Sequence, residues 1–339
     1  MRIIYLSKNM INYDSALYQR DVINEFAKDK SVIFYGPGFK GFEPKEAIEK
    51  TIKRLGGADY LIVGHSWLYD LPGAQVDIYP DLHIEDCSIK KAIILNKEYV
   101  NLDAKLNWIS NKGFSFGFSH NHDVAHYKQV TGVPFKFWPF GFNESIFNAK
   151  TQEYKDIDFA FSGILKNINT DYFQSDTRIL VMNKFFHCAG SIPLIKKKNY
   201  KNLNIFWNTL PPTRLQQKIA IILNKYRFLN DLEYAALQKR SRAYLNTLSP
   251  SGLVGTRFFE NMACKTLVLC EQSKNINNIF PSDCFIDFKS DFKDFDQKFD
   301  FSVSDSDERN KIVEKAYEVV ISKHTWKSRV NDLINTIKN

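Results

Sequence analysis

The stretch S-P-S-G-L-V-G-T-R-F-F-E-N-M-A-C-K-T-L-V-L-C-E-Q, residues 249–272, decides the fold of this chain. It opens with a turn of small residues at 249–252, continues with an amphipathic helix expected over about 253–264, and closes with an apolar strand at 266–270. A further apolar strand at 243–248 leads into it. Together these segments predict a strand–loop–helix–strand unit of a parallel sheet.

The start of the predicted helix is a candidate phosphate site. Helix N-termini carry unpaired N–H groups and a partial positive charge, which favour bound anions. Arg257 and Glu260 lie three residues apart and therefore share one face of the helix. This pair suits a sugar nucleotide, with the arginine at the diphosphate and the glutamate at the ribose hydroxyls. The alternative is an ordinary ion pair on a solvated face, which stabilises a helix by only about 0.2–0.5 kcal/mol.

Length and composition indicate a globular protein with more than one core. A chain of 339 residues exceeds the usual size of a single domain, so two domains are expected. No apolar run reaches the roughly 18–20 residues that a membrane span needs, and the N-terminus predicts a first strand instead of a signal peptide. The five cysteines are scattered without a C-x-x-C pair, which indicates neither disulfides nor zinc and predicts a cytoplasmic location.

Positive charge concentrates in the second half of the chain. The net charge is +8, and residues 151–339 hold 28 Lys and Arg against 21 Asp and Glu. This surplus suits an anionic ligand or an anionic membrane surface, while solvated lysines are the alternative. Nucleic-acid binding is not expected, because basic and aromatic runs are not interleaved and no recognised module is present.

Apolar strands alternate with amphipathic helices along most of the chain. Strands are expected at 2–6, 31–35, 59–64, 91–95, 114–118 and 135–138, and again at 156–161, 203–206, 243–248, 266–270 and 284–288. Strands joined through helices form parallel sheets with right-handed crossovers. We therefore predict an α/β fold of two Rossmann-like domains that face each other across a cleft. The N-terminal domain is expected over 1–145, the C-terminal domain over 155–320, and a C-terminal helix over 321–339 that crosses back to the N-terminal domain.

Three residues of the first half follow predicted strands, at the sheet edge where such folds bind ligands. They are Asp14, His65 and His120, and each is a candidate catalytic base. Each also has another interpretation. Asp14 could cap the next helix, His65 could be a hydrogen-bonded residue at a strand end, and His120 could contact donor phosphate.

The string G-L-V-G-T-R-F-F-E-N-M-A-C at 252–264, followed by an apolar strand, resembles the donor-binding segment of GT-B glycosyltransferases. It is similar in particular to the group of CgeB-like spore maturation proteins and glycosyl transferases group 1 domains. The resemblance extends to the F-x-G turn within 159–163, the P-x-G segment within 138–141 and the H-T-W-x-x-R ending at 324–329. The first half matches in its general layout only.

The resemblance implies transfer of a sugar from a nucleotide-diphosphate sugar to a hydroxyl of a glycan or lipid-linked acceptor, as in cell-surface polysaccharide assembly. It implies that Glu260 binds the donor ribose and that Arg257 neutralises the leaving diphosphate. Gly252 stands where many retaining relatives carry a second glutamate, and Lys265 stands in place of a glycine. Further donor-binding candidates are Gly163, Lys166, Arg178, Ser251, Gly252, Gly255 and Thr256.

No cofactor and no essential metal are expected, because GT-B enzymes commonly stabilise the leaving group with basic side chains and helix dipoles. The D-x-D triplets at 294–296 and 305–307 fall in an amphipathic helix and at a helix cap. His120, His122 and His126 lack the further ligands of a zinc site. The expected partners are a nucleotide-sugar donor, a glycan or lipid-linked acceptor and an anionic membrane surface on the cytoplasmic side.

Two other functions stay open at this point. A nucleotide-sugar 2-epimerase or hydrolase on the same fold would keep the donor site and need no acceptor. A two-lobed small-molecule binding protein would need no catalytic base.

Overall fold

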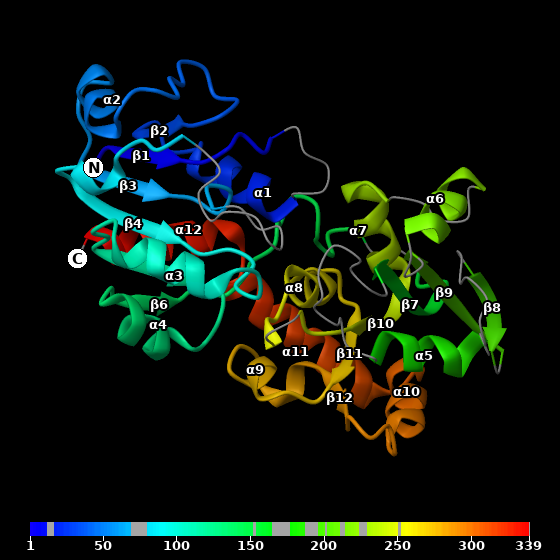
Figure 1. Cartoon of the computed structure of the whole chain (residues 1–339). Helices are drawn as coiled ribbons and strands as arrows, with labels where there is room; N and C mark the ends of the chain where they lie inside the picture. The colour runs from blue at the N-terminus through cyan, green and yellow to red at the C-terminus, as the bar shows by residue number, and fades with distance from the viewer. Residues whose placement is uncertain are drawn as a thin grey trace. The chain divides into compact units, whose positions relative to one another are not determined.

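The computed structural model describes residues 1–11, 17–68, 80–151, 154–164, 177–186, 196–200, 202–210, 214–223, 229–249 and 252–338. The chain divides into two compact units, one formed by Met1–Pro139 with Trp326–Asn339 and the other by Phe140–Thr325 (Figure 1). The sequence predicts domain limits at 145–155 and 320. In the part of the chain that is described, no helix has the length and apolar character needed to cross a membrane.

The first unit contains a parallel sheet of six strands in the order β2-β1-β3-β4-β5-β6. The strands are β1 (Ile3–Leu6), β2 (Val32–Tyr35), β3 (Tyr60–Val63), β4 (Lys90–Ile94), β5 (Phe116–Ser119) and β6 (Phe135–Phe137). The helices are α1 (Leu17–Phe26), α2 (Ile48–Arg54), the 3-10 turn η1 (Ile84–Asp86), α3 (Leu102–Ser110), α4 (Val124–Thr131) and α12 (Trp326–Lys338). The unit is Rossmann-like, as predicted.

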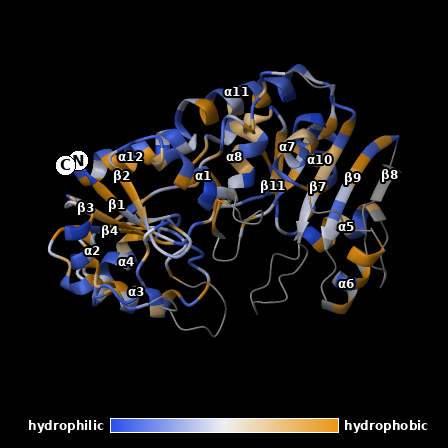
Figure 2. Ribbon diagram, turned by 90° about the horizontal axis from the view of Figure 1, so that it is seen from above, coloured by the Kyte–Doolittle hydropathy of each residue, from blue (hydrophilic) through white to orange (hydrophobic). Residues whose placement is uncertain are grey.

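Both faces of this sheet are buried, which explains why its strands are short apolar runs. Ile4 and Leu6 join the core formed with α2 and α3. Tyr5 faces the opposite side, where its ring centroid lies 4.7 Å from that of Phe26 in α1. Helix α12 packs against α1 on that side with Trp326 buried, so the C-terminal helix belongs to the first unit, as predicted. Figure 2 shows hydrophobic colour along β1 and β2.

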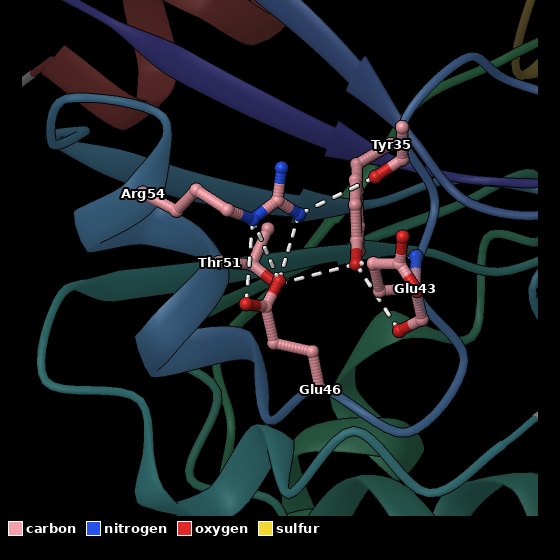
Figure 3. A network of polar contacts seen from close by, with 6 residues as sticks. Tyr35, Glu43, Glu46, Thr51 and Arg54 are labelled. Carbon is pink, nitrogen blue, oxygen red and sulfur yellow. Dashed lines mark hydrogen bonds and ion pairs between the residues drawn. The ribbon is translucent and has the colours of Figure 1, made fainter.

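A polar network ties α2 to the end of β2 (Figure 3). The buried hydroxyl of Thr51 donates to Glu46 at 2.7 Å and lies 3.2 Å from the hydroxyl of Tyr35. Arg54 pairs with the same Glu46 carboxylate at 2.7 Å. The hydrogen bond from Arg54, followed by that from Thr51, lowers the pKa of Glu46 below its ordinary value. This network ties the helix to the end of the strand, in addition to the apolar contacts of Ile48 and Ile52 with the core.

The second unit contains six strands in the order β12-β11-β10-β7-β9-β8. The strands are β7 (Ile157–Ile164), β8 (Lys196–Tyr200), β9 (Leu203–Leu210), β10 (Ser241–Asn246), β11 (Leu267–Glu271) and β12 (Ile286–Phe288). The helices are α5 (Thr177–Phe186), α6 (Arg214–Ile222), α7 (Asp231–Arg240), α8 (Thr256–Ala263), α9 (Lys274–Asn277), the 3-10 turn η3 (Ser282–Cys284), α10 (Phe295–Val303) and α11 (Asp307–Lys323).

Five of these strands are parallel, and only β8 runs antiparallel, beside β9. The sequence K-K-K-N-Y of β8 lacks the apolar run of a buried strand, so the pattern does not predict it. Helices cover both faces of the sheet. Phe159 and Phe161 pack with α5 and α10 on one side, while Ala160 and Tyr244 pack with α7 on the other.

Helix α8 begins at Thr256, three residues later than the sequence predicts. Gly252 adopts a left-handed conformation with φ of 73°, and the Ser249 N–H donates to the Leu253 carbonyl at 2.9 Å. These features close a compact loop whose side chains Leu253 and Val254 are buried. The apolar character of residues 253–254 therefore comes from loop burial and not from a helix face.

Candidate active site

The carboxyl ends of β7, β10 and β11 lie at one edge of the second sheet, because these neighbouring strands are parallel. Two arginines from different helices reach this edge. Arg178, in the first turn of α5, donates from Nε to the hydroxyl of Thr247 at 2.7 Å, directly after β10. Arg257, in the first turn of α8, donates from Nε to the hydroxyl of Tyr234 at 2.7 Å.

Both guanidinium groups lie against the ring of Phe161 in β7. The guanidinium carbons of Arg178 and Arg257 are 5.6 Å and 5.8 Å from the ring centroid. Gly163, two residues further along the strand, leaves space for this arrangement. A Cβ atom at Gly163 would lie 3.3 Å from both terminal nitrogens of Arg257. The aromatic ring attracts each cation and so holds the two together.

This arrangement concentrates positive charge. Arg178 is only 7% exposed, and burial together with the charge of Arg257 lowers the pKa of Arg178 to about 9. Two cations on one ring repel each other, and an anion that contacts both removes this repulsion. The edge of the sheet is therefore a candidate anion site.

The N-terminus of α8 lies in the same motif. Gly255 is its N-cap residue and provides no side-chain cap, and the first turn, which starts at Thr256, contains no acidic residue. The N–H groups of that turn are thus not engaged by a capping side chain. The left-handed Gly252 shapes the loop before it, and its carbonyl accepts from the amide of Asn275 at 2.9 Å. Such a helix start complements the arginines as a seat for phosphate.

Glu260 lies one turn beyond Arg257 on α8 and is 4% exposed. Burial lowers the pKa of Arg257, but Tyr234, Tyr244 and Glu260 together raise it above its ordinary value. A buried carboxylate next to an anion site can accept hydrogen bonds from the hydroxyls of a ligand. At the end of β11, Glu271 already accepts one such bond from the hydroxyl of Thr177.

In the first unit, His65 and His120 form a buried pair at the carboxyl ends of β3 and β5. Their Nε2 atoms are 3.1 Å apart, and their rings are stacked with centroids 5.3 Å apart. They are 2% and 4% exposed. Burial, followed by the charge of His120, holds the pKa of His65 well below 6.5. Burial lowers the pKa of His120 to about 3, although its bond to the Trp138 carbonyl opposes this.

The neighbours of this pair determine where its protons lie. Nδ1 of His120 is 2.8 Å from the Trp138 carbonyl, which can only accept, so this nitrogen carries the proton of the neutral ring. Nε2 of His120 is then the acceptor, and His65 donates to it from Nε2. The lone pair of His65 is consequently on Nδ1, which is buried and has no hydrogen-bond partner among the described residues. This nitrogen is in the form that accepts a proton.

Solved structures identify the fold of the whole chain. It is similar over 100% of its length to the E. coli trehalose-6-phosphate protein (99% of that chain, TM-score 0.66, 10% identity). It is similar over 99% of its length to the glycosyltransferase of Rickettsia africae (97% of that chain, TM-score 0.62, 12% identity). It is also similar over 100% to HepE of Anabaena (100% of that chain, TM-score 0.58, 10% identity). At these identities the likeness shows the fold alone, which is GT-B.

The family comparison supplies the class of activity. Residues 182–335 match the family described as "Glycosyl transferase-like". The chain is a glycosyltransferase. The matched part contains Arg257 and Glu260 and begins just after Arg178. A comparison with curated protein sequences finds no match.

The sequence pattern of this glycosyltransferase does not reveal one buried acid, Glu98. Glu98 is 1% exposed and accepts from the His120 N–H at 2.8 Å and from the hydroxyls of Ser119 and Tyr127 at 2.7 Å each. Burial raises the pKa of Glu98 despite these donors. Glu98 thus fixes the loop that carries His120. Its only sequence signal is its position, a few residues after an apolar strand.

Three predicted site residues, Asp14, Lys166 and Ser251, lie outside the described residues. The predicted acidic triplets are engaged elsewhere: Asp294 accepts from the Lys289 N–H at 2.9 Å, and Asp296 pairs with Lys184 at 2.6 Å. The side-chain cap of α11 is Ser306. Within the described stretches, the cluster of potential metal ligands is Asp81, His83 and Glu85, all exposed and none of them a predicted site residue.

Proposed function

We propose that this glycosyltransferase takes its sugar from a nucleotide-diphosphate sugar, and that the second unit binds that donor. The observation that supports this is the pair Arg178 and Arg257 on the ring of Phe161 beside the N-terminus of α8. A diphosphate carries enough negative charge and enough oxygens to contact both guanidiniums and the helix N–H groups at once. HepE of Anabaena was solved in complex with UDP and with UDP and glucose, and the E. coli protein with UDP-2-fluoro glucose.

In this proposal the arginines act on the leaving group. Negative charge grows on the diphosphate as the bond to the sugar breaks, so cations fixed beside it stabilise the transition state more than the ground state. Glu260 accepts hydrogen bonds from the ribose hydroxyls. We propose no metal for this step, since two guanidiniums and a helix N-terminus supply the positive charge.

The histidine pair of the first unit is proposed to handle the proton of the acceptor hydroxyl. His65 presents the lone pair on Nδ1, while His120 fixes the tautomer through its bond to Trp138. The depressed pKa keeps His65 neutral at neutral pH, so its Nδ1 lone pair is not already occupied by a proton. We propose a hydroxyl of a glycan or lipid-linked molecule as acceptor, with the enzyme cytoplasmic and at the inner face of the membrane.

Donor binding is tested with a thermal-shift panel of UDP-, GDP-, CMP- and dTDP-sugars. At least one of them should raise the melting temperature, and Arg178→Gln should weaken its binding roughly 10- to 100-fold, the effect of losing one charged hydrogen bond. Glu260→Gln should weaken it as well. Glu98→Gln is the matched control, because it changes a buried carboxylate of the other unit. No shift with any sugar nucleotide would remove the support for the donor assignment.

The proton-transfer assignment needs a turnover assay. His65→Asn should keep donor affinity and lose transfer, whereas His126→Asn, at an exposed histidine of α4, should keep both. Transfer at the parent rate by His65→Asn would show that another group is the base. Release of free sugar without any acceptor dependence would instead favour a hydrolase or 2-epimerase.

A further inference from the structure

A cavity of about 770 Å³ lies within the second unit. It is bordered by Lys155 just before β7, Arg242 at the start of β10 and Lys265 just before β11. These are the amino ends of parallel strands whose carboxyl ends carry the arginine pair. The cavity is therefore at the opposite edge of the sheet from the candidate donor site.

The lining of this cavity is strongly basic. Its cationic side chains are Lys155, Lys239, Arg242, Lys265 and Arg309. Two carboxylates, Asp305 and Glu314, also line it. Cations thus outnumber acids by five to two among the lining residues, with Lys265 paired to Glu314 at 2.6 Å and Arg242 paired to Asp158 at 3.4 Å.

Arg309 is the most buried cation of this lining, at 6% exposure. It donates to the carbonyl of Ser302 at 3.0 Å, to the side chain of Asn310 at 2.9 Å and to the carbonyl of Arg242. These three acceptors are neutral, so they orient the guanidinium without cancelling its charge. Burial, followed by the charge of Arg242, lowers the pKa of Arg309 to about 10, although Asp305 opposes this.

Other cations are held in place as well. Nζ of Lys155 donates to the carbonyls of Lys239 and Ser241 at 3.0 Å and 2.8 Å. The side chain of Lys239 also lines the cavity. Basic groups that are already oriented lose little entropy when an anion binds.

We propose that this cavity is a second binding site, for a phosphorylated sugar. Its volume is in the range of small-molecule pockets. The basic groups suit the phosphate, since phosphate oxygens accept several charged hydrogen bonds. Tyr154 lines the cavity with 84% of its surface exposed, so its ring is available to stack on the apolar face of a sugar.

The test is calorimetric titration of the full chain carrying Arg257→Ala, which weakens anion binding at the donor site. The probes are inorganic phosphate, glucose 6-phosphate and glucose. Glucose 6-phosphate should bind, and adding Lys239→Glu should weaken it by about tenfold or more, since an attraction becomes a repulsion. Lys289→Glu, the same charge change at an exposed lysine of this unit, should leave binding within about twofold. Tyr154→Ala should weaken glucose 6-phosphate and spare phosphate.

Three results would overturn the proposal. Glucose 6-phosphate that fails to bind once Arg257 is replaced would show that phosphate occupies the donor site alone. Equal losses with Lys239→Glu and Lys289→Glu would show a general charge effect. Binding of glucose 6-phosphate unchanged by Tyr154→Ala would contradict the sugar contact. A failure of the donor assignment would be seen in different measurements, namely the thermal shifts with sugar nucleotides and the donor affinity of Glu260→Gln. It can therefore be told apart from a failure of this proposal.

Discussion

The buried histidine pair makes the first unit sensitive to acid, and His120→Asn isolates this effect. An asparagine amide can still donate to the Trp138 carbonyl that now accepts from Nδ1 of His120. The variant cannot titrate at this position. The difference between the pH slopes of parent and variant therefore reports the titration of His120 together with the change that its loss makes to His65.

The sign and size follow from the pKa values. The pKa of His120 falls from 6.5 in the unfolded chain to about 3 in the folded chain. Between these two pH values the unfolded chain therefore binds a proton at His120 and the folded chain does not. Stability is therefore complete above about pH 6.5 and declines as pH falls towards about 3. Integrated from pH 7 to pH 5, His120 alone costs the folded state about 2 kcal/mol. The lowered pKa of His65 acts in the same direction.

The assay is urea unfolding at pH 7 and pH 5, followed by tryptophan fluorescence. Trp138 reports on the site, because its ring is stacked on His120 with centroids 5.5 Å apart. The parent should lose about 2 kcal/mol more than His120→Asn across this interval. Identical slopes for the parent and His120→Asn would refute the buried, neutral state assigned to this pair.

Three further predictions concern single contacts. Thr51→Val should lower the free energy of unfolding by about 1–2 kcal/mol through loss of the bond to Glu46, and an unchanged urea midpoint would contradict the network of Figure 3. Gly252→Ala should lower the free energy of unfolding by about 1–2 kcal/mol because of the left-handed φ alone. The loss should be larger still, because the added Cβ would collide with the side-chain amide of Asn275. A melting temperature equal to that of the parent would argue against this loop conformation. Phe161→Leu should weaken donor binding by about threefold to 30-fold, as expected for losing cation–π contacts of roughly 0.5–2 kcal/mol. An unchanged donor affinity would show that the Phe161 ring does not contribute to the site.

The sequence alone predicts the α/β architecture and, within the candidate donor site, the pair Arg257 and Glu260. Apolar runs separated by amphipathic helices predict parallel α/β sheets, because each such strand must be covered on both faces. The spacing of Arg257 and Glu260 predicts that they share a face of one helix, since helix geometry is local. The C-terminal helix and the two Rossmann-like units follow from the same patterns.

Tertiary structure alone decided the contacts between distant segments. Arg178 and Arg257 meet on Phe161, and His65 meets His120, only because parallel strands bring their carboxyl ends to one edge of each sheet. The proton positions of the histidines depend on a carbonyl of Trp138, which no side-chain pattern encodes. The start of α8 at Thr256 also depends on tertiary structure. Leu253 is buried in a loop, and an apolar residue buried in a loop cannot be told from one buried on a helix face by sequence alone. Local periodicity fixes elements, whereas the chemistry of the sites depends on which elements the fold places side by side.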